Sequence, residues 1–148
     1  MYRNTGQAVQ VSSSNEVVLS DDVQGATTFQ LLSCRASNIV PAALRQSCVS
    51  LADVNRTDWY VRQYDDFLRV DPEYETDSLT LFELDSSFIL LKDTFYQGTY
   101  ALQSVNFPDH YIKSHVDGRL TIAQLDNSAD YNDTASFRIY DYNSSGMY

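Results

Sequence analysis

The side chains best suited to covalent chemistry in this chain are its two cysteines, Cys34 and Cys48. They lie 14 residues apart (48 − 34), and both border strand-like runs that neighbouring elements could bring together. A disulfide between them would stabilise the folded chain by about 3 kcal/mol in the chain-entropy model. The alternative is a pair of unrelated buried thiols. We predict the disulfide, which would leave no free cysteine to act as a nucleophile and would favour an oxidising compartment.

The histidines and carboxylates form no catalytic or metal-binding pattern. His110 and His115 are five residues apart (115 − 110), which does not suit a helical metal-binding pair. The acidic stretches 71–77 and 126–133 could hold Ca²⁺, but their spacing fits no known calcium loop, and a solvated acidic surface is the favoured interpretation. Twenty acidic residues make some close carboxylate pair unavoidable, yet none suggests the paired acids of a glycosidase. We therefore predict a non-enzymatic protein without a metal or a cofactor.

The length and charge of the chain limit what it can be. At 148 residues with 43% hydrophobic residues it can bury a real core, and we expect residues 1–148 to form a single domain. The net charge of −10 argues against nucleic acid and anionic membrane surfaces as partners. The apolar runs are too short to span a bilayer. No signal segment opens the sequence, and we expect it to be a domain cut from a longer protein.

Three N-glycosylation acceptor patterns point to the outside of the cell. They begin at Asn55, Asn132 and Asn143, each followed by a Thr or Ser at the second position. Together with the predicted disulfide, they predict an extracellular, secreted glycoprotein.

The elements that must position these residues follow an internal repeat. Leu68 follows Val17 by 51 residues (68 − 17), and Leu120 follows Leu68 by 52 (120 − 68). Each leads to a segment in which two small residues precede a phenylalanine, and these phenylalanines are Phe29, Phe88 and Phe137. A period near 50 residues indicates repeated supersecondary units that bury their apolar faces against each other. We expect the two sets of residues to occupy equivalent core positions.

Strand signals dominate each repeat. Period-2 alternation of apolar residues puts one face of each segment inward, and turn residues such as Asp65-Asp66 and Asp117-Gly118 separate the segments. Four strands in each of three repeats predict an all-β fold, a β-trefoil with repeats at about 1–33, 49–93 and 99–146 and an inter-repeat loop at 34–48. A β-sandwich is the alternative. No sustained helical period occurs, although Pro41 could start one helical turn.

The third repeat carries a more specific pattern. Its run Ser-Val-Asn-Phe-Pro-Asp-His-Tyr-Ile-Lys, residues 104–113, is followed by Thr134-Ala135-Ser136-Phe137. This resembles the arabinofuranosidase-B-type (AbfB) carbohydrate-binding domain, whose repeats read roughly Ser-x-Asn-Tyr/Phe-Pro-x-x-Tyr-Ile-Arg-His, with Asp-Ala-Ser/Thr-Phe further on. The second repeat also matches, and the first matches only through its spacing. The resemblance implies a β-trefoil with one potential pocket per repeat for arabinofuranose side chains of plant polysaccharides.

The resemblance also implies which residues would bind the sugar. A sugar needs a carboxylate for its hydroxyls, a second polar group for orientation and an aromatic face. In the family these come from the His after Ile-Arg, a neighbouring aromatic residue and the Asp of Asp-Ala-Ser/Thr-Phe. The matching residues of the second repeat are Gln63, Tyr64 and Asp85. Alternatively, Asp85 only caps a turn through nearby backbone N–H groups.

The other two repeats depart further from the family pattern. In the third, the His and Asp positions hold Ser114 and Thr134, while His115 and Asp133 each lie one residue away. His115 and Asp133 would form a pocket if a one-residue bulge compensates both shifts, and otherwise they are solvated loop residues. In the first repeat Val11 and Ala26 occupy these places, so we expect that repeat to be structural.

The sequence thus predicts a non-catalytic extracellular module that binds glycans or polysaccharide side chains, with the second repeat as its best site. Because the pockets are degraded, an alternative stays open. It is a structural or protein-interaction domain of a large secreted, adhesive or filamentous assembly, with other extracellular proteins or parent-chain domains as partners.

Overall fold

The structure, a computed structural model, describes residues 2–3 and 6–140 of the chain. Its strands in these residues are β1 (Tyr2–Arg3), β2 (Ala8–Val11), β3 (Val17–Ser20), β4 (Phe29–Ser33), β5 (Cys48–Asp53), β6 (Trp59–Tyr64), β7 (Phe67–Pro72), β8 (Phe88–Lys92), β9 (Tyr100–Ser104), β10 (His110–Ser114), β11 (Leu120–Gln124) and β12 (Phe137–Arg138). The helical segments are η1 (Val23–Gly25), η2 (Ala42–Ser47), η3 (Glu73–Glu75), α1 (Leu79–Asp85) and α2 (Ala129–Thr134).

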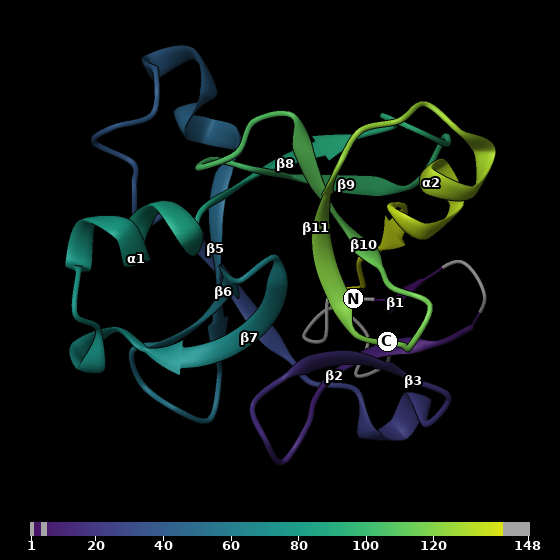
Figure 1. The fold of residues 1–148 in the computed structure, drawn as a ribbon, viewed down its shortest axis with the longest axis horizontal. Helices are drawn as coiled ribbons and strands as arrows, with labels where there is room; N and C mark the ends of the chain where they lie inside the picture. Colours follow the sequence, from purple (N-terminus) through teal and green to yellow (C-terminus); the bar gives the residue numbers. More distant parts are fainter. Residues whose placement is uncertain (1, 4–5, 141–148) are drawn as a thin grey trace.

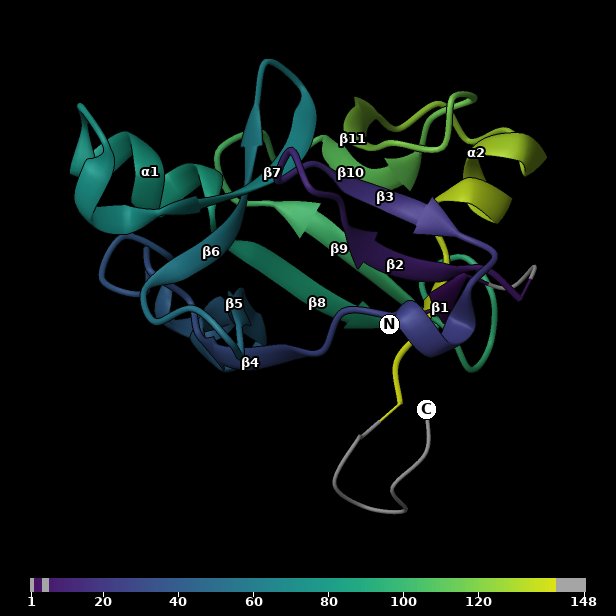
Figure 2. The same ribbon diagram turned by 90° about the horizontal axis from the view of Figure 1, so that it is seen from below.

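These strands form a barrel that is covered by three hairpins. Six barrel strands pair in the order β1, β12, β9, β8, β5, β4, and all their pairings are antiparallel. The hairpins β2–β3, β6–β7 and β10–β11 lie together on one side of the barrel (Figure 2). Each repeat contributes two barrel strands and one hairpin (Figure 1). The predicted all-β fold, a β-trefoil of three four-stranded repeats, is therefore confirmed.

The core repeats as the sequence predicts. Val17, Leu68 and Leu120 are all buried in one apolar cluster. Phe88 and Phe137 are fully buried in the same cluster, and Phe29 packs against it while partly exposed. Because these side chains come from equivalent positions of the three units, no unit can bury its apolar face without the other two.

The hairpin turns bind the three units to one another in a cycle. Asn15, Asp66 and Gly118 lie in these turns and have positive φ angles of 64°, 68° and 90°. The carbonyl of each accepts a backbone N–H from a strand of another unit, and these bonds run from Val70 to Asn15 (2.8 Å), from Ile122 to Asp66 (2.9 Å) and from Leu19 to Gly118 (2.7 Å). Donors and acceptors occupy matching positions, so the cycle is a direct result of the repeat.

Helices α1 and α2 differ from the sequence-based expectation, which included no helix beyond the turn after Pro41. That turn is present as η2. Ser78 and Ser128 start α1 and α2, and their hydroxyls accept the N–H groups of Leu81 and Tyr131. With seven and six residues, the two helices are too short to show a helical period in the sequence. They lie on opposite sides of the barrel (Figure 1).

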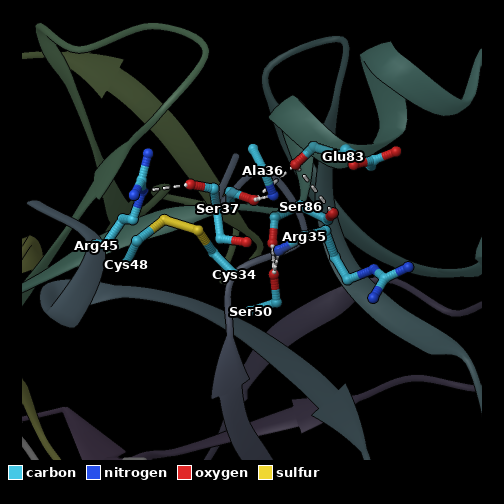
Figure 3. Close-up of a disulfide and its surroundings, with 10 residues drawn as sticks. Cys34, Arg35, Ala36, Ser37, Arg45, Cys48, Ser50, Glu83 and Ser86 are labelled. Atoms are coloured by element: carbon cyan, nitrogen blue, oxygen red, sulfur yellow. Dashed lines mark hydrogen bonds between the residues drawn. A yellow bond between two sulfur atoms is a disulfide. The ribbon is translucent and has the colours of Figure 1, made fainter. Parts of the chain in front are cut away.

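The loop between the first and second units is closed by the predicted Cys34–Cys48 disulfide, whose Cα atoms are 5.2 Å apart (Figure 3). The loop is also bonded to the C-terminal end of α1. The Ser50 hydroxyl accepts the N–H of Arg35 (3.0 Å) and donates to the carbonyl of Ser86 (2.7 Å). The N–H of Ala36 donates to the Ser87 hydroxyl (3.0 Å). The disulfide loop therefore supports the helix end that carries Asp85.

Candidate functional site

Asp85 is the last residue of α1, and its carboxylate is held by two amides from different units. Oδ1 accepts Nε2 of Gln63 at 2.6 Å and Nδ2 of Asn106 at 2.7 Å. Gln63 lies on β6, and Asn106 follows β9 in the third unit. Asp85 and Gln63 are both buried. The structure thus brings two of the predicted site residues together and adds Asn106, which the pocket assignment did not include.

The second oxygen of this carboxylate stays available. In the described part of the chain Oδ2 of Asp85 makes no hydrogen bond. Asp85 as a whole is only 5% exposed, but Oδ2 is not fully buried, because Nε of Arg35 is the fully buried side-chain atom without a partner among the same residues. The partners of Asp85 are side chains rather than the backbone N–H groups of a cap. A fixed carboxylate with one open oxygen can accept a ligand hydroxyl.

Tyr64, the third residue predicted for this site, points the other way from Gln63 because side chains alternate along β6. Tyr64 as a whole is 59% exposed, and its ring lies under the Arg62 guanidinium, whose carbon is 4.9 Å from the ring centroid. It lines a cleft of about 440 Å³ between the β6–β7 hairpin and the start of α1. An exposed ring of this kind can stack on the apolar face of a sugar.

The same cleft contains a charged cluster that the sequence interpretation missed. Asp71 on β7 accepts Nε of Arg62 and Nε of Arg69, both at 2.7 Å, through one oxygen, Oδ2. The strand register places Arg62 directly opposite Arg69. Two like charges opposite each other are unfavourable unless a counter-charge lies between them. The two-residue turn Asp65-Asp66 fixes this register, so the sequence does contain a signal for the cluster.

In the third unit, His115 and Asp133 have different partners. The His115 ring stacks edge-on against Phe67, and its Nδ1 lies 3.1 Å from Asp117. Asp133, on α2, accepts the hydroxyl of Tyr96 at 2.6 Å, and this hydrogen bond raises the pKa of Tyr96. Neither contact brings the histidine to the carboxylate. The role of His115 and Asp133 in sugar binding stays a prediction.

The matching family positions of the third and first units are used structurally. Ser114 is buried, and the Thr134 hydroxyl donates to carbonyls within α2. In the first unit the N–H of Val11 donates to the Thr27 hydroxyl at 2.9 Å. Of the three units, the second one has the carboxylate at its family position.

The predicted glycosylation positions differ in their surroundings. Asn55 is exposed in the turn between β5 and β6, whereas Asn132 is half-buried inside α2. Asn143 lies outside the described residues. Asn55 therefore has the surroundings best suited to carrying a glycan.

Residues 2–3 and 6–140 contain no group of three or more His, Cys, Asp or Glu side chains that could hold a metal ion. Within the same ranges, every helix is too short or too polar to cross a membrane.

A β-trefoil with a fixed carboxylate and an exposed aromatic ring defines a class of small binding domains. The model of the alpha-L-arabinofuranosidase B (ABFB) domain matches residues 3–139, so the chain belongs to this family. The resemblance seen in the sequence is thereby confirmed, and it associates the chain with carbohydrate binding. No curated protein matches the sequence.

Solved structures share the fold at low sequence identity. An arabinofuranosidase complexed with arabinofuranosyl-alpha-1,2-xylobiose aligns with a TM-score of 0.62 at 18% identity, over 89% of this chain and 30% of that one. An endo-β-galactosidase from Clostridium perfringens that releases GlcNAcα1-4Gal aligns at 0.59 and 11% identity, over 93% and 30%. Interleukin-36alpha aligns at 0.57 and 14% identity, over 90% and 85%. The chain thus spans about a third of the two enzymes, and at these identities the likeness is one of fold.

Proposed function

We propose that this chain is a non-catalytic extracellular module that binds carbohydrate at the Asp85 site of its second unit. The observation that carries the proposal is the Asp85 carboxylate, fixed by Gln63 and Asn106 through Oδ1 while Oδ2 has no hydrogen-bond partner among the described residues. A carboxylate fixed in this way is ready to accept a sugar hydroxyl without first becoming ordered, which lowers the entropic cost of binding. Tyr64 points to the other side of β6, so its ring would stack on a part of the ligand that reaches the neighbouring cleft.

The family membership and the disulfide support this proposal. Domains of this family are associated with arabinofuranosidases, so a furanose or another small neutral sugar of a polysaccharide side chain is the first ligand class to test. The Cys34–Cys48 bridge and the exposed Asn55 acceptor fit an extracellular location.

Titration calorimetry tests the proposal. The protein would be titrated with arabinofuranosyl-α-1,2-xylobiose, arabinoxylan, arabinan and a panel of animal glycans. Asp85→Asn keeps an oxygen for Gln63 and Asn106 but removes the charge, and we expect it to lower affinity by about ten- to a hundredfold. Asp58→Asn is the matched control, because Asp58 is exposed in a turn with a φ angle of 64° that Asn tolerates.

The host matters for this test. Asp85→Asn completes an Asn-x-Ser acceptor with Ser87, so both variants should be made in the periplasm of a bacterium, where the disulfide forms and this acceptor stays unmodified. Equal affinities of Asp85→Asn and Asp58→Asn would show that Asp85 does not take part in binding.

One observation favours a second function, that of a structural or protein-interaction domain. Tyr74, Leu79 and Leu81 are exposed apolar residues on or near α1. Apolar groups gathered on one part of a surface are typical of protein contacts. Failure of the folded protein to bind any glycan of the panel would favour this alternative.

A further inference from the structure

The cleft beside Tyr64 has walls from two elements that also carry the Asp85 site. Strand β6 contributes Arg62 and Tyr64 to the lining and also holds Gln63. Helix α1 contributes Leu81 and Phe82 and ends at Asp85. Phe82 lies three residues before Asp85, and residues at this spacing share one side of a helix. A ligand that begins at Asp85 could therefore continue along α1 into the cleft.

The donors in the cleft are held in place. Both arginines use Nε for Asp71, and in the described residues no hydrogen bond engages their terminal amino groups. The Arg62 guanidinium carbon also lies 5.4 Å from the Phe82 ring centroid, in addition to its contact with Tyr64. The Asp71 side chain is only 15% exposed, so the two guanidinium groups are bound to a nearly buried anchor. Donors fixed in this way lose little conformational entropy when a ligand binds.

The fold does not require this cluster. In the other two units, the positions that match Arg62, Arg69 and Asp71 are uncharged except for one lysine. They are Gln10, Val18 and Ser20 in the first unit and Lys113, Thr121 and Ala123 in the third. Both of those units form the same hairpin without an Arg–Asp–Arg cluster. The cluster is thus a specific property of the second unit.

The chemistry of the lining selects the class of ligand. Arginine donors face the acceptors Asp71, Glu75 and Asp77, with hydroxyls at Thr76 and Ser78 and apolar surface at Tyr64, Leu81 and Phe82. Two arginines against three carboxylates leave the lining slightly negative, and the whole chain carries −10, so an anionic ligand would be repelled. Mixed donors and acceptors around an aromatic ring suit a neutral sugar.

We propose that this cleft is a second saccharide subsite, which binds a neutral sugar residue adjoining the one held at Asp85. The proposal rests on the proposed function, and it predicts that affinity depends on the length of the saccharide. Methyl α-L-arabinofuranoside would need the Asp85 site alone, whereas arabinofuranosyl-α-1,2-xylobiose would also engage the two arginines.

Calorimetry with these two ligands tests the subsite. We expect Arg69→Gln to lower the affinity for the trisaccharide by about tenfold and that for the monosaccharide by less than about twofold. Arg45→Gln is the matched control, because Arg45 lies in η2 within the disulfide loop and outside the cleft. In the wild-type protein, the Nε–Hε NMR signals of Arg62 and Arg69 should shift with the trisaccharide, which provides a readout that does not depend on any variant.

The outcomes separate the two proposals. Loss of binding in Asp85→Asn but not in Arg69→Gln, with unmoved arginine signals, would overturn the subsite and leave the proposed function standing. Loss of binding in Arg69→Gln but not in Asp85→Asn would show that the cleft binds the sugar and that Asp85 does not. Tighter, salt-sensitive binding of tri-galacturonic acid would contradict the neutral class of ligand. A wild-type protein that binds neither neutral probe would contradict both proposals.

Discussion

Nε2 of Gln63 donates to Oδ1 of Asp85 over 2.6 Å, and this is the contact through which strand β6 holds the end of helix α1. The same oxygen accepts Asn106 from the third unit, so one carboxylate joins two repeats. Two side-chain amides thus depend on one acceptor. Asp85 has a structural role in addition to the proposed role in binding.

The first prediction follows from this dependence. Asp85→Ala leaves the Gln63 and Asn106 amides without their acceptor, and we expect it to lower the free energy of unfolding by about 2–3 kcal/mol. Asp85→Asn keeps an acceptor oxygen and should cost about 1 kcal/mol. Urea unfolding followed by circular dichroism measures both. Equal stabilities of the two variants would show that the amides find other partners.

The second prediction concerns the disulfide. Replacing Cys34 and Cys48 together by serine should lower the free energy of unfolding by about 3 kcal/mol without changing the fold. Because Ala36 and Ser50 connect the loop to the end of α1, we also expect faster amide hydrogen exchange at Ser86 and Ser87. Intact mass after alkylation without reductant is the control. Two alkylated thiols in the native protein would contradict the bridge.

The third prediction is a pH dependence at Tyr131. Burial raises the pKa of this phenol to about 12. A raised folded-state pKa means that its contribution to stability is complete below the unfolded value of about 10 and is lost as the pH rises from there towards 12. Tyr131→Phe should therefore make the alkaline loss of stability shallower than in the wild type.

At neutral pH the same variant should cost only about 1 kcal/mol, because it removes the hydrogen bond from Tyr131 to the Ala123 carbonyl. Phe82 occupies the matching position of the second unit, so a phenylalanine ring fits there. Urea unfolding at pH 7 and pH 11 provides the comparison, with Tyr74→Phe at an exposed position as the control. Parallel pH profiles for all three proteins would count against the assignment.

The fourth prediction concerns the cycle of hydrogen bonds between the hairpin turns. Gly118 has a φ angle of 90°, and an added Cβ would meet no atom within 4 Å, so any cost of substitution there comes from the backbone. Gly118→Ala should cost about 1–2 kcal/mol, and Gly118→Asn less, because Asn15 holds the matching turn with a φ angle of 64°.

Gly98 offers a matched control for this effect. It also has a positive φ, of 81°, and open space around it, but it lies outside the cycle. Thermal unfolding should show a larger loss for Gly118→Ala than for Gly98→Ala, since only the first displaces the acceptor of Leu19. Equal losses would mean that the cycle contributes little beyond local strain.

The apolar framework of the fold could be predicted from the sequence because it repeats. Val17, Leu68 and Leu120 recur at nearly constant spacing, and a barrel with threefold symmetry must place equivalent residues at equivalent depth. The disulfide was predictable for a related reason, since both cysteines border strands that pair in the barrel. Helices α1 and α2 were not, because their start depends on single serine caps rather than on a period.

The candidate site was predictable only in part. Family positions identify Gln63 and Asp85, which do meet. The partner Asn106 lies 21 residues from Asp85 in another unit, so no local pattern links the two. Tyr64 faces the cleft because side chains alternate along a strand, which a position-by-position comparison with the family does not take into account.

The pairing of β1 with β12 has a consequence for engineering. Tyr2 and Arg3 lie opposite Arg138 and Phe137, so the first and last strands described are direct neighbours in the barrel. Each of the three units therefore contacts both of the others, and only the links between them decide which unit comes first in the sequence. A circular permutant that joins these strands and opens the loop between β8 and β9 would keep every strand pairing of the barrel. The same geometry suits the module to insertion as a guest domain into a surface loop of a host protein, because the chain enters and leaves it at one place.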